Sequence, residues 1–264
     1  MTEPTRSPIK DKPLRLPGQS LREERAELIQ DKLELPLLLA VFFLVLAGWE
    51  WVGEYRHIPR SPWVVTVAAG FAILFAVWRF FRVRQRLRNL RQGEEGERAV
   101  GQFLERLRET GYQVFHDVIS YNANIDHVLI GTAGVFTIET KTWSKPTRGD
   151  ARISFDGERV LAGGNEPDRN PVVQARAQAS WLKQQLEEST GRKLDVFPVV
   201  LFPGWFVEPV PRAPPGVRHV WLLEPKALPA FLAQEPARLT PEDAKLVAFH
   251  LSRFIRNLER DRAR

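Results

Sequence analysis

The chain has 264 residues, of which 44% are hydrophobic and 27% are charged, enough for one sizeable folded domain and a smaller appendage. It has no cysteine, which excludes a disulfide framework, a thiolate zinc site and a cysteine nucleophile. The formal net charge is +6, yet without the six arginines of residues 79–91 the remaining 32 basic residues equal the 32 acidic ones. The excess of positive charge is therefore local, and a membrane explains it better than DNA does. These arginines are Arg79, Arg82, Arg84, Arg86, Arg88 and Arg91.

Residues 1–32 are polar and charged, and prolines are scattered through their first half. This composition predicts a disordered, charged tail that leads into a short helix near residues 21–32. Acidic residues precede the first apolar stretch and no small-residue cleavage site is evident, so we exclude a secretory signal.

Two apolar stretches follow, and they predict a transmembrane helical hairpin over residues 33–81, with helices at about 35–52 and 62–81. Each stretch is near the lower limit of about 17 residues for a spanning helix. Neither has the polar stripe of a helix at a domain surface. A pair of buried core helices is the alternative. Tryptophans lie at the ends of both stretches, where an interfacial aromatic belt belongs, namely Trp49, Trp51, Trp63 and Trp78.

Residues 82–92 are expected to form a basic juxtamembrane linker. Lysine and arginine near the ends of a spanning helix favour the cytoplasmic side. The loop between the stretches has only two such basic residues, Arg56 and Arg60. We therefore expect a multi-pass protein of the cell (inner) membrane with both termini cytoplasmic. The arginines of residues 79–91 can also rest on the anionic head groups of the lipid bilayer.

Residues 93–264 have the composition of an α/β domain. Apolar residues at helical spacing predict a helix at residues 94–109, and Gly111 ends it. The remaining elements are read from alternation, turn residues and helix caps. They are strands at residues 112–119, 125–130, 135–141, 152–155 and 159–161, a helix at 170–189, strands at 196–202 and 219–223, and helices at 227–232 and 241–260.

The most informative residues lie between Ile125 and Lys141. Residues two apart on a strand share a face, so Glu139 and Lys141 project together. Asp126 begins the preceding strand. If the turn at residues 131–134 closes an antiparallel pair, Asp126 and Glu139 come together at one end of the sheet. A solvated ion pair is the common alternative for a Glu-x-Lys pair, but charged residues on an otherwise apolar strand need a reason.

Two carboxylates and a lysine suit the hydrolysis of a phosphodiester. Carboxylate oxygens hold Mg²⁺ (or Mn²⁺), and Mg²⁺ needs only one or two protein carboxylates. The ion polarises the phosphate and lowers the pKa of a bound water. A lysine beside the phosphorus can position that water or stabilise the developing charge.

Four sequence blocks occur in an order that resembles NERD, the nuclease-related domain allied to the PD-(D/E)XK nucleases. The resemblance covers residues 93–201, about 40% of the chain. One departure is visible, because Ile125 stands where the superfamily has its proline; that proline carries no chemistry. The blocks are GEEGE at residues 93–97, IDHVLIG at 125–131, GVFTIETK at 134–141, and NP at 170–171 with Gln174.

The resemblance implies a restriction-endonuclease-like mixed sheet flanked by helices. It also implies that Asp126 and Glu139 bind the metal and that Lys141 assists the water. Glu97 would be a further acidic member; alternatively it is a first-turn glutamate favoured by the helix dipole. Gln174 would face the site and touch metal, water or substrate; alternatively it lies on a solvated helix face.

Other residues carry weaker signals. Trp143, Lys145 and Arg148 follow the Glu-x-Lys strand and could line a nucleic-acid groove through stacking and phosphate contacts, although an ordinary loop is equally consistent. His127 should point away from Asp126 and serve packing.

The leading interpretation is a membrane-anchored, metal-dependent nuclease that acts on DNA rather than RNA. The alternative is a non-catalytic nucleic-acid-binding or scaffold module on a nuclease-like fold at the membrane, because a fold does not fix a function. A substrate other than nucleic acid also stays open.

Overall fold

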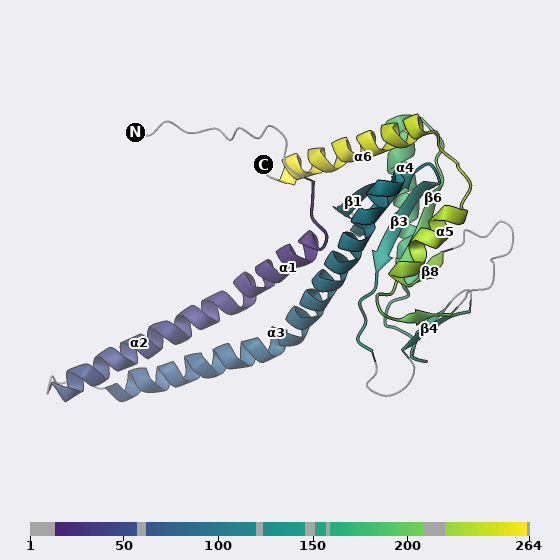
Figure 1. Cartoon of the computed structure of the whole chain (residues 1–264). Coiled ribbons are helices and arrows are strands. Elements are labelled where there is room, and N and C mark those ends of the chain that lie inside the picture. Colours follow the sequence, from purple (N-terminus) through teal and green to yellow (C-terminus); the bar gives the residue numbers. More distant parts are fainter. Residues whose placement is uncertain are drawn as a thin grey trace, which may run out of the picture. The chain divides into compact units, whose positions relative to one another are not determined.

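The structure, a computed structural model of the chain, describes residues 14–56, 62–119, 124–145, 151–156, 159–208 and 220–262. The chain divides into two compact units. Unit 1 comprises the residues up to Gln19 together with Glu95–Arg264, and unit 2 comprises Ser20–Glu94. Figure 1 labels the helices of both units and several of the strands.

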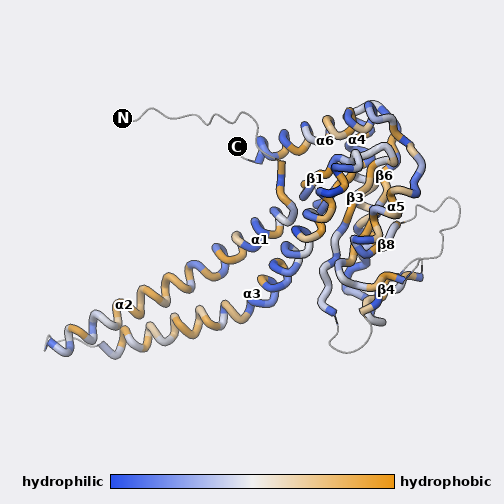
Figure 2. The backbone as a smooth tube through the Cα atoms, in the orientation of Figure 1, coloured by the Kyte–Doolittle hydropathy of each residue, from blue (hydrophilic) through white to orange (hydrophobic). Residues whose placement is uncertain are grey.

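Unit 2 is made of helices. Helix α1 (Gln19–Ile29), a π-helical turn (Gln30–Glu34) and α2 (Leu35–Tyr55) follow one another without a break, and α3 (Pro62–Glu105) begins after the loop. Figure 2 shows the apolar character of α2 and of the first part of α3. Two helical segments, Gln19–Tyr55 and Pro62–Thr110, are long and apolar enough to cross a membrane, judged by length and composition.

The hairpin has the reverse of the side-chain distribution of a soluble domain. Its large apolar side chains are exposed, for example Phe42 at 59% and Phe71 at 69%. Near the loop, Trp51 and Trp63 are in edge contact at 5.3 Å, and the Trp51 indole donates to the Thr66 hydroxyl at 3.0 Å. Small residues that allow close helix approach are buried instead. They are Ala40, Ala47, Ala69 and Ala76.

The expected linker at residues 82–92 is helical. Helix α3 runs through it and includes most of the helix that was expected at residues 94–109. The reason is composition, since arginine, glutamine and leucine favour helix and neither glycine nor proline occurs between residues 82 and 92. The helix ends in a 3₁₀ turn (Arg106–Thr110), and Gly111 then adopts a left-handed conformation with φ of 91°.

Unit 1 contains a mixed five-stranded sheet of order β1-β2-β3-β6-β8. The β1–β2 and β2–β3 pairs are antiparallel, whereas β3–β6 and β6–β8 are parallel. A second sheet has the order β5-β4-β7. The strands are β1 (Gln113–Val118), β2 (Ile125–Gly131), β3 (Gly134–Thr140), β4 (Arg152–Phe155), β5 (Val160–Ala162), β6 (Val196–Leu201), β7 (Phe206–Val207) and β8 (Trp221–Leu223).

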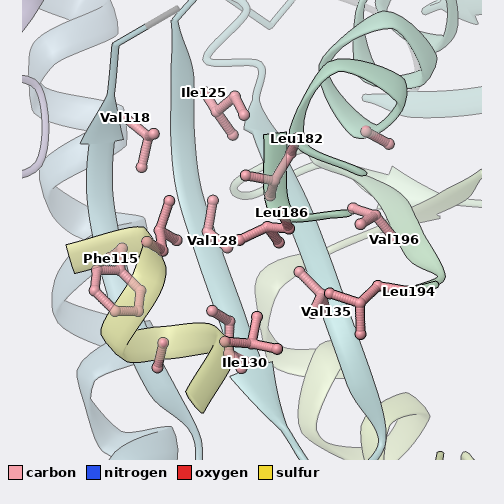
Figure 3. Packing of buried hydrophobic residues seen from close by; sticks show 14 of the residues in the cluster. Phe115, Val118, Ile125, Val128, Ile130, Val135, Leu182, Leu186, Leu194 and Val196 are labelled. Carbon is pink, nitrogen blue, oxygen red and sulfur yellow. The ribbon is translucent and has the colours of Figure 1, made fainter. Parts of the chain in front are cut away.

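Helices flank both faces of the larger sheet. The side chain of Val135 on β3 belongs to a core with α4 (Pro171–Thr190) and α6 (Pro241–Arg262), part of which Figure 3 shows. Its neighbour Phe136 belongs to a core with α3 and α5 (Leu228–Gln234) on the other face. This alternation confirms the predicted mixed α/β architecture with a sheet between helices.

Residues 14–18, which directly precede α1, belong to unit 1. Leu14 packs against the core that α4 and α6 share, and Arg15 is only 4% exposed. A Cβ atom at Gly101 of α3 would lie 2.7 Å from Pro17, so only glycine fits there. The composition of this segment predicted disorder because it does not reveal partners far away in the sequence.

Candidate functional site

The β2–β3 hairpin brings Asp126 and Glu139 to the same end of the sheet. Gly131 pairs with Gly134, as the turn predicted, and the last pair of the register is His127 with Ile138. The next position in this register sets Asp126 opposite Glu139. The Thr140 backbone N–H donates to Asp126 Oδ2 at 2.6 Å and fixes that carboxylate at the end of β3.

Both oxygens of the Glu139 carboxylate have a donor. The side chain of Glu139 is 3% exposed. Lys141 Nζ lies 2.5 Å from Oε1, and Gln178 Nε2 donates to Oε2 at 2.6 Å. Lys141 also donates to Gln174 Oε1 at 2.9 Å. The ammonium group therefore ties the strand carboxylate to helix α4.

Gln174 and Gln178 reach the site because they are four residues apart on one face of α4. The helix begins beside the site, where the Asn170 side chain caps it by accepting from the Val172 N–H at 2.9 Å. Gln174 was expected at the site, whereas Gln178 was not. A signal for it existed, since Gln178 is a polar residue on the buried side of the helix, next to Ala179.

Glu97 is the third carboxylate of the site and comes from α3. Its approach depends on Gly96, because a Cβ atom there would overlap the Thr142 side chain just after β3. Burial raises the pKa of Glu97 to about 8, and repulsion from Asp117 and Glu139 adds to the effect. Among its neighbours, Lys141 lowers this pKa.

The electrostatics of Asp126 are similar. Its pKa is raised well above the ordinary value, first because the carboxylate is removed from water. Repulsion from Glu139 and then from Glu97 acts in the same direction. The Thr140 N–H and the Lys141 ammonium act against it. Lys141 therefore compensates the negative charge of this cluster only in part.

The donor set fits a hard divalent cation. Within the described residues no group of three or more histidine, aspartate or glutamate side chains is suited to hold a metal. Two carboxylates are sufficient for Mg²⁺, which keeps several of its waters. Asp126 and Glu139 would be the two carboxylates here, and a cation would relieve the repulsion that, after burial, helps to raise the pKa of Asp126. Close by, Gln178 Oε1 is buried without a hydrogen-bond partner.

Asp117, on β1, lies beside these carboxylates. The β1–β2 register pairs His116 with His127 and Val118 with Ile125, so Asp117 falls opposite Asp126. Its carboxylate accepts from Arg15 Nε at 2.7 Å, with both side chains almost completely buried. Neither residue was predicted.

The residues expected to line a nucleic-acid groove have other contacts. The Trp143 ring packs against Phe202 at 5.3 Å between ring centres, and its carbonyl accepts from the Trp205 indole at 3.2 Å. Lys145 lies beside Gly204, whose added Cβ would be 3.4 Å from the Lys145 Nζ. Arg148 lies outside the described residues. Trp143 thus serves packing at the edge of the smaller sheet.

His127 is fully buried, as expected of a packing residue, but it is also hydrogen-bonded. Its Nδ1 lies 2.9 Å from the Nδ1 of His116, and the Nε2 of His116 lies 2.8 Å from Glu105. If His116 donates from Nε2 to the carboxylate, its Nδ1 accepts and His127 donates. Burial lowers the pKa of both imidazoles.

No curated protein sequence and no solved structure matches the chain significantly. A family model does match part of it. Residues 92–203 fit the model of NERD, the nuclease-related domain, and these residues include Glu97, Asp126, Glu139, Lys141 and Gln174. The match supports a nuclease-related identity for the part of the chain that carries the site.

Proposed function

We propose that this protein is a metal-dependent nuclease that hydrolyses phosphodiester bonds of nucleic acid while held at a membrane. The observation that carries the proposal is the meeting of Asp126, Glu139 and Lys141 at the end of two paired strands. The match to the nuclease-related domain supports a nucleic acid as the partner. A restriction-endonuclease-like arrangement of the sheet and kinship with the PD-(D/E)XK nucleases belong to the same proposal.

Asp126 and Glu139 would hold Mg²⁺ or Mn²⁺. The bound ion would neutralise phosphate charge and supply a water of lowered pKa. The protein holds both carboxylates in place beforehand. The Thr140 N–H fixes Asp126, and Gln178 fixes the far oxygen of Glu139. Fixed ligands avoid reorganisation at the moment of reaction.

Lys141 is the group proposed to act on the reacting phosphate or its water. Its Nζ is held between Glu139 and Gln174, and its side chain is 20% exposed. A positive charge held in this way can stabilise negative charge that develops on the phosphate. Gln174 orients the ammonium, and Glu97 adds a further carboxylate.

DNA is the proposed substrate rather than RNA. Trp143, Lys145 and Arg148 remain the candidates for contacts outside the carboxylate site. Two of these residues, Trp143 and Lys145, are described by the structure, and they follow β3 as an aromatic ring and an exposed lysine.

The membrane part of the proposal rests on unit 2. Exposed apolar side chains cover α2 and the first part of α3, and water would disfavour such a surface. Arg82 and Arg84 stack over the rings of Trp78 and Phe81 just beyond the apolar stretch. This arrangement suits an interface with anionic head groups. We propose the cell (inner) membrane, with both termini and the nuclease-like domain cytoplasmic.

Cleavage assays on the full chain in lipid nanodiscs test the catalytic proposal. Supercoiled plasmid, linear duplex, single-stranded DNA and RNA are incubated with Mg²⁺, with Mn²⁺ or with chelator. Metal-dependent cleavage is expected, and it should disappear in Glu139→Ala and Lys141→Ala.

Glu188→Ala is the matched control, because Glu188 is exposed on α4 and accepts a hydrogen bond from Gln184, one turn earlier in the same helix. It should cleave as the wild type does. If the wild type is active and Glu139→Ala still cleaves, the proposed site is excluded as the catalytic site.

Single-cysteine labelling tests the membrane topology, since the chain has no native cysteine. Tyr55→Cys, at an 87% exposed position beside the loop, should react with an impermeant maleimide added to intact cells. A cysteine at Arg264 should react only after lysis. Reaction of the Arg264→Cys variant in intact cells would refute the proposed orientation.

A non-catalytic nucleic-acid-binding or scaffold module is the second candidate. The observation that favours it is the balanced charge outside residues 79–91, because duplex binding normally shows a basic stripe. Affinity for nucleic acid without metal-dependent turnover, from a folded wild-type chain, would decide for this candidate.

A further inference from the structure

Arg15 is a buried cation beside the carboxylate site, although it precedes α3 by more than forty residues in the sequence. Its side chain is 3% exposed. Nε donates to Asp117 at 2.7 Å, and Nη1 donates to Glu259 of α6 at 2.7 Å. A planar guanidinium can serve both partners at once, whereas an ammonium group on a flexible stem cannot do so with the same geometry.

Asp117 needs this support more than an ordinary strand residue does. It is the only non-glycine residue with positive φ in the described part of the chain, at 49°. For a non-glycine residue this conformation costs energy and persists when its surroundings enforce it. The contact with Arg15 helps to hold Asp117 in this conformation, and Asp117 lies opposite Asp126.

The same segment contacts α3 at two positions one turn apart. The Gly18 backbone N–H donates to the Glu97 carboxylate, with Gly18 at φ of 71°. Pro17 lies against Gly101, which has no side chain to displace it. Residues 14–18 thus join the strand of Asp117, the helix of Glu97 and helix α6.

We propose that residues 14–18 complete the nuclease-like site, with Arg15 as a positioning residue that sets Asp117 and, through the Gly18 contact, the place of Glu97. The inference rests on the proposed function. The two partners described for the Arg15 guanidinium, Asp117 and Glu259, are not the carboxylates proposed to hold the metal, so its role is positioning. It fixes the framework around them, so the catalytic unit is assembled from two stretches of chain that the hairpin separates in sequence.

Two variants of the full chain in nanodiscs test this inference by different physical routes. Arg15→Gln removes the guanidinium. Gly101→Ala leaves every charge in place but forces Pro17 away, although alanine favours helix. Both should speed amide hydrogen exchange in Gln113–Val118 and around Glu97 by about tenfold or more in metal-free protein.

Two control variants match these changes. Arg108 also ties a helical turn to β1, through the Val114 carbonyl at 2.6 Å, but at the other end of the strand. Arg108→Gln should leave kcat unchanged. Gly70 is in α3 with nothing within 4 Å of its added Cβ, so Gly70→Ala should change neither exchange nor cleavage.

The kinetic measurement separates positioning from simple stability. In Arg15→Gln and Gly101→Ala, kcat should fall by about tenfold or more while KM stays within about twofold, as expected when only transition-state geometry is lost. Faster exchange with unchanged kcat would overturn the positioning role, and unchanged exchange would overturn the inference altogether. If the wild type cleaves nothing, the proposed function fails, and the exchange data still decide whether residues 14–18 organise the carboxylates.

Discussion

Asp117 and Asp126 are neighbours on adjacent strands, but their environments are opposite. Asp117 is paired with a buried guanidinium at 2.7 Å. Asp126 receives a backbone N–H and faces Glu139, and its pKa is raised well above the ordinary value. A carboxylate whose charge is balanced within the protein supports the fold. A carboxylate whose charge is not balanced is available to a cation.

The largest expected effect concerns Asp126. Asp126→Asn should lower the cleavage rate by more than about 100-fold, the scale typical of removing one preorganised charge-stabilising group. Folding should not suffer, because asparagine still accepts from the Thr140 N–H and carries no charge. Cleavage rates at saturating Mg²⁺ check the loss of activity, and thermal melting in chelator checks that folding is unharmed. A rate within tenfold of wild type would remove Asp126 from the site.

Asp117→Asn, unlike Asp126→Asn, should lower the stability of the fold. It breaks a buried ion pair, and loss of one partner costs about 3 kcal/mol of stability because the other charge stays buried. Chemical denaturation of the full chain measures this change. Asp195→Asn is the control, since Asp195 is 70% exposed and its pair with Lys183 is worth less than about 1 kcal/mol. Equal losses in the two variants would contradict the assignment of Asp117 to the fold.

Glu97 gives a pH-dependent effect of intermediate size. Its pKa is about 8 in the folded domain against an ordinary 4.5, so between these values the folded state binds more protons than the unfolded state. The stability of metal-free protein should therefore fall as pH rises from about 4.5 through 8. Glu97→Gln should match wild type near pH 5 and melt at a higher temperature at pH 9. Addition of Mg²⁺ should reduce the difference in melting temperature between Glu97→Gln and the wild type at pH 9.

The smallest expected effect concerns the paired imidazoles. The pKa values of His116 and His127 lie below 6.5 in the fold, so the unfolded chain takes up protons first as pH falls. Their contribution to stability is present above about pH 6.5 and is lost below it. His127→Asn, which can still donate to His116, should have a shallower acid limb in a melting series from pH 7.5 to 5. An unchanged acid limb would mean that groups other than these imidazoles cause the loss of stability at low pH.

The β2–β3 hairpin was predictable because its signals are local. Strand alternation and the turn at residues 131–134 suffice to set Asp126 opposite Glu139. Gln174 was expected through the resemblance to a nuclease-related domain. Gln178 was missed because a lone polar residue among apolar ones on a helix does not reveal its partner.

Long-range contacts and composition account for the other differences. The Arg15–Asp117 pair spans 102 residues, and no local pattern reports such a pairing. The charge of residues 82–92 predicts a linker but not its conformation; α3 runs through it because the segment has strong helix formers and no breaker. The smaller sheet contains the hairpin expected at residues 152–161. Strand β7 (Phe206–Val207), which is distant in the sequence, pairs with β4 as its third strand.

The membership of residues 14–18 in unit 1 has a consequence for the path of the chain. The polypeptide leaves unit 1 at Gln19 and re-enters it at Glu95, so unit 2 is an excursion that starts and finishes in one folded body. A folded body cannot lie on both sides of a bilayer. If the excursion enters a membrane, it must therefore cross an even number of times or not at all. This parity is independent of where the arginines lie, and a single crossing would pull Arg15 away from Asp117.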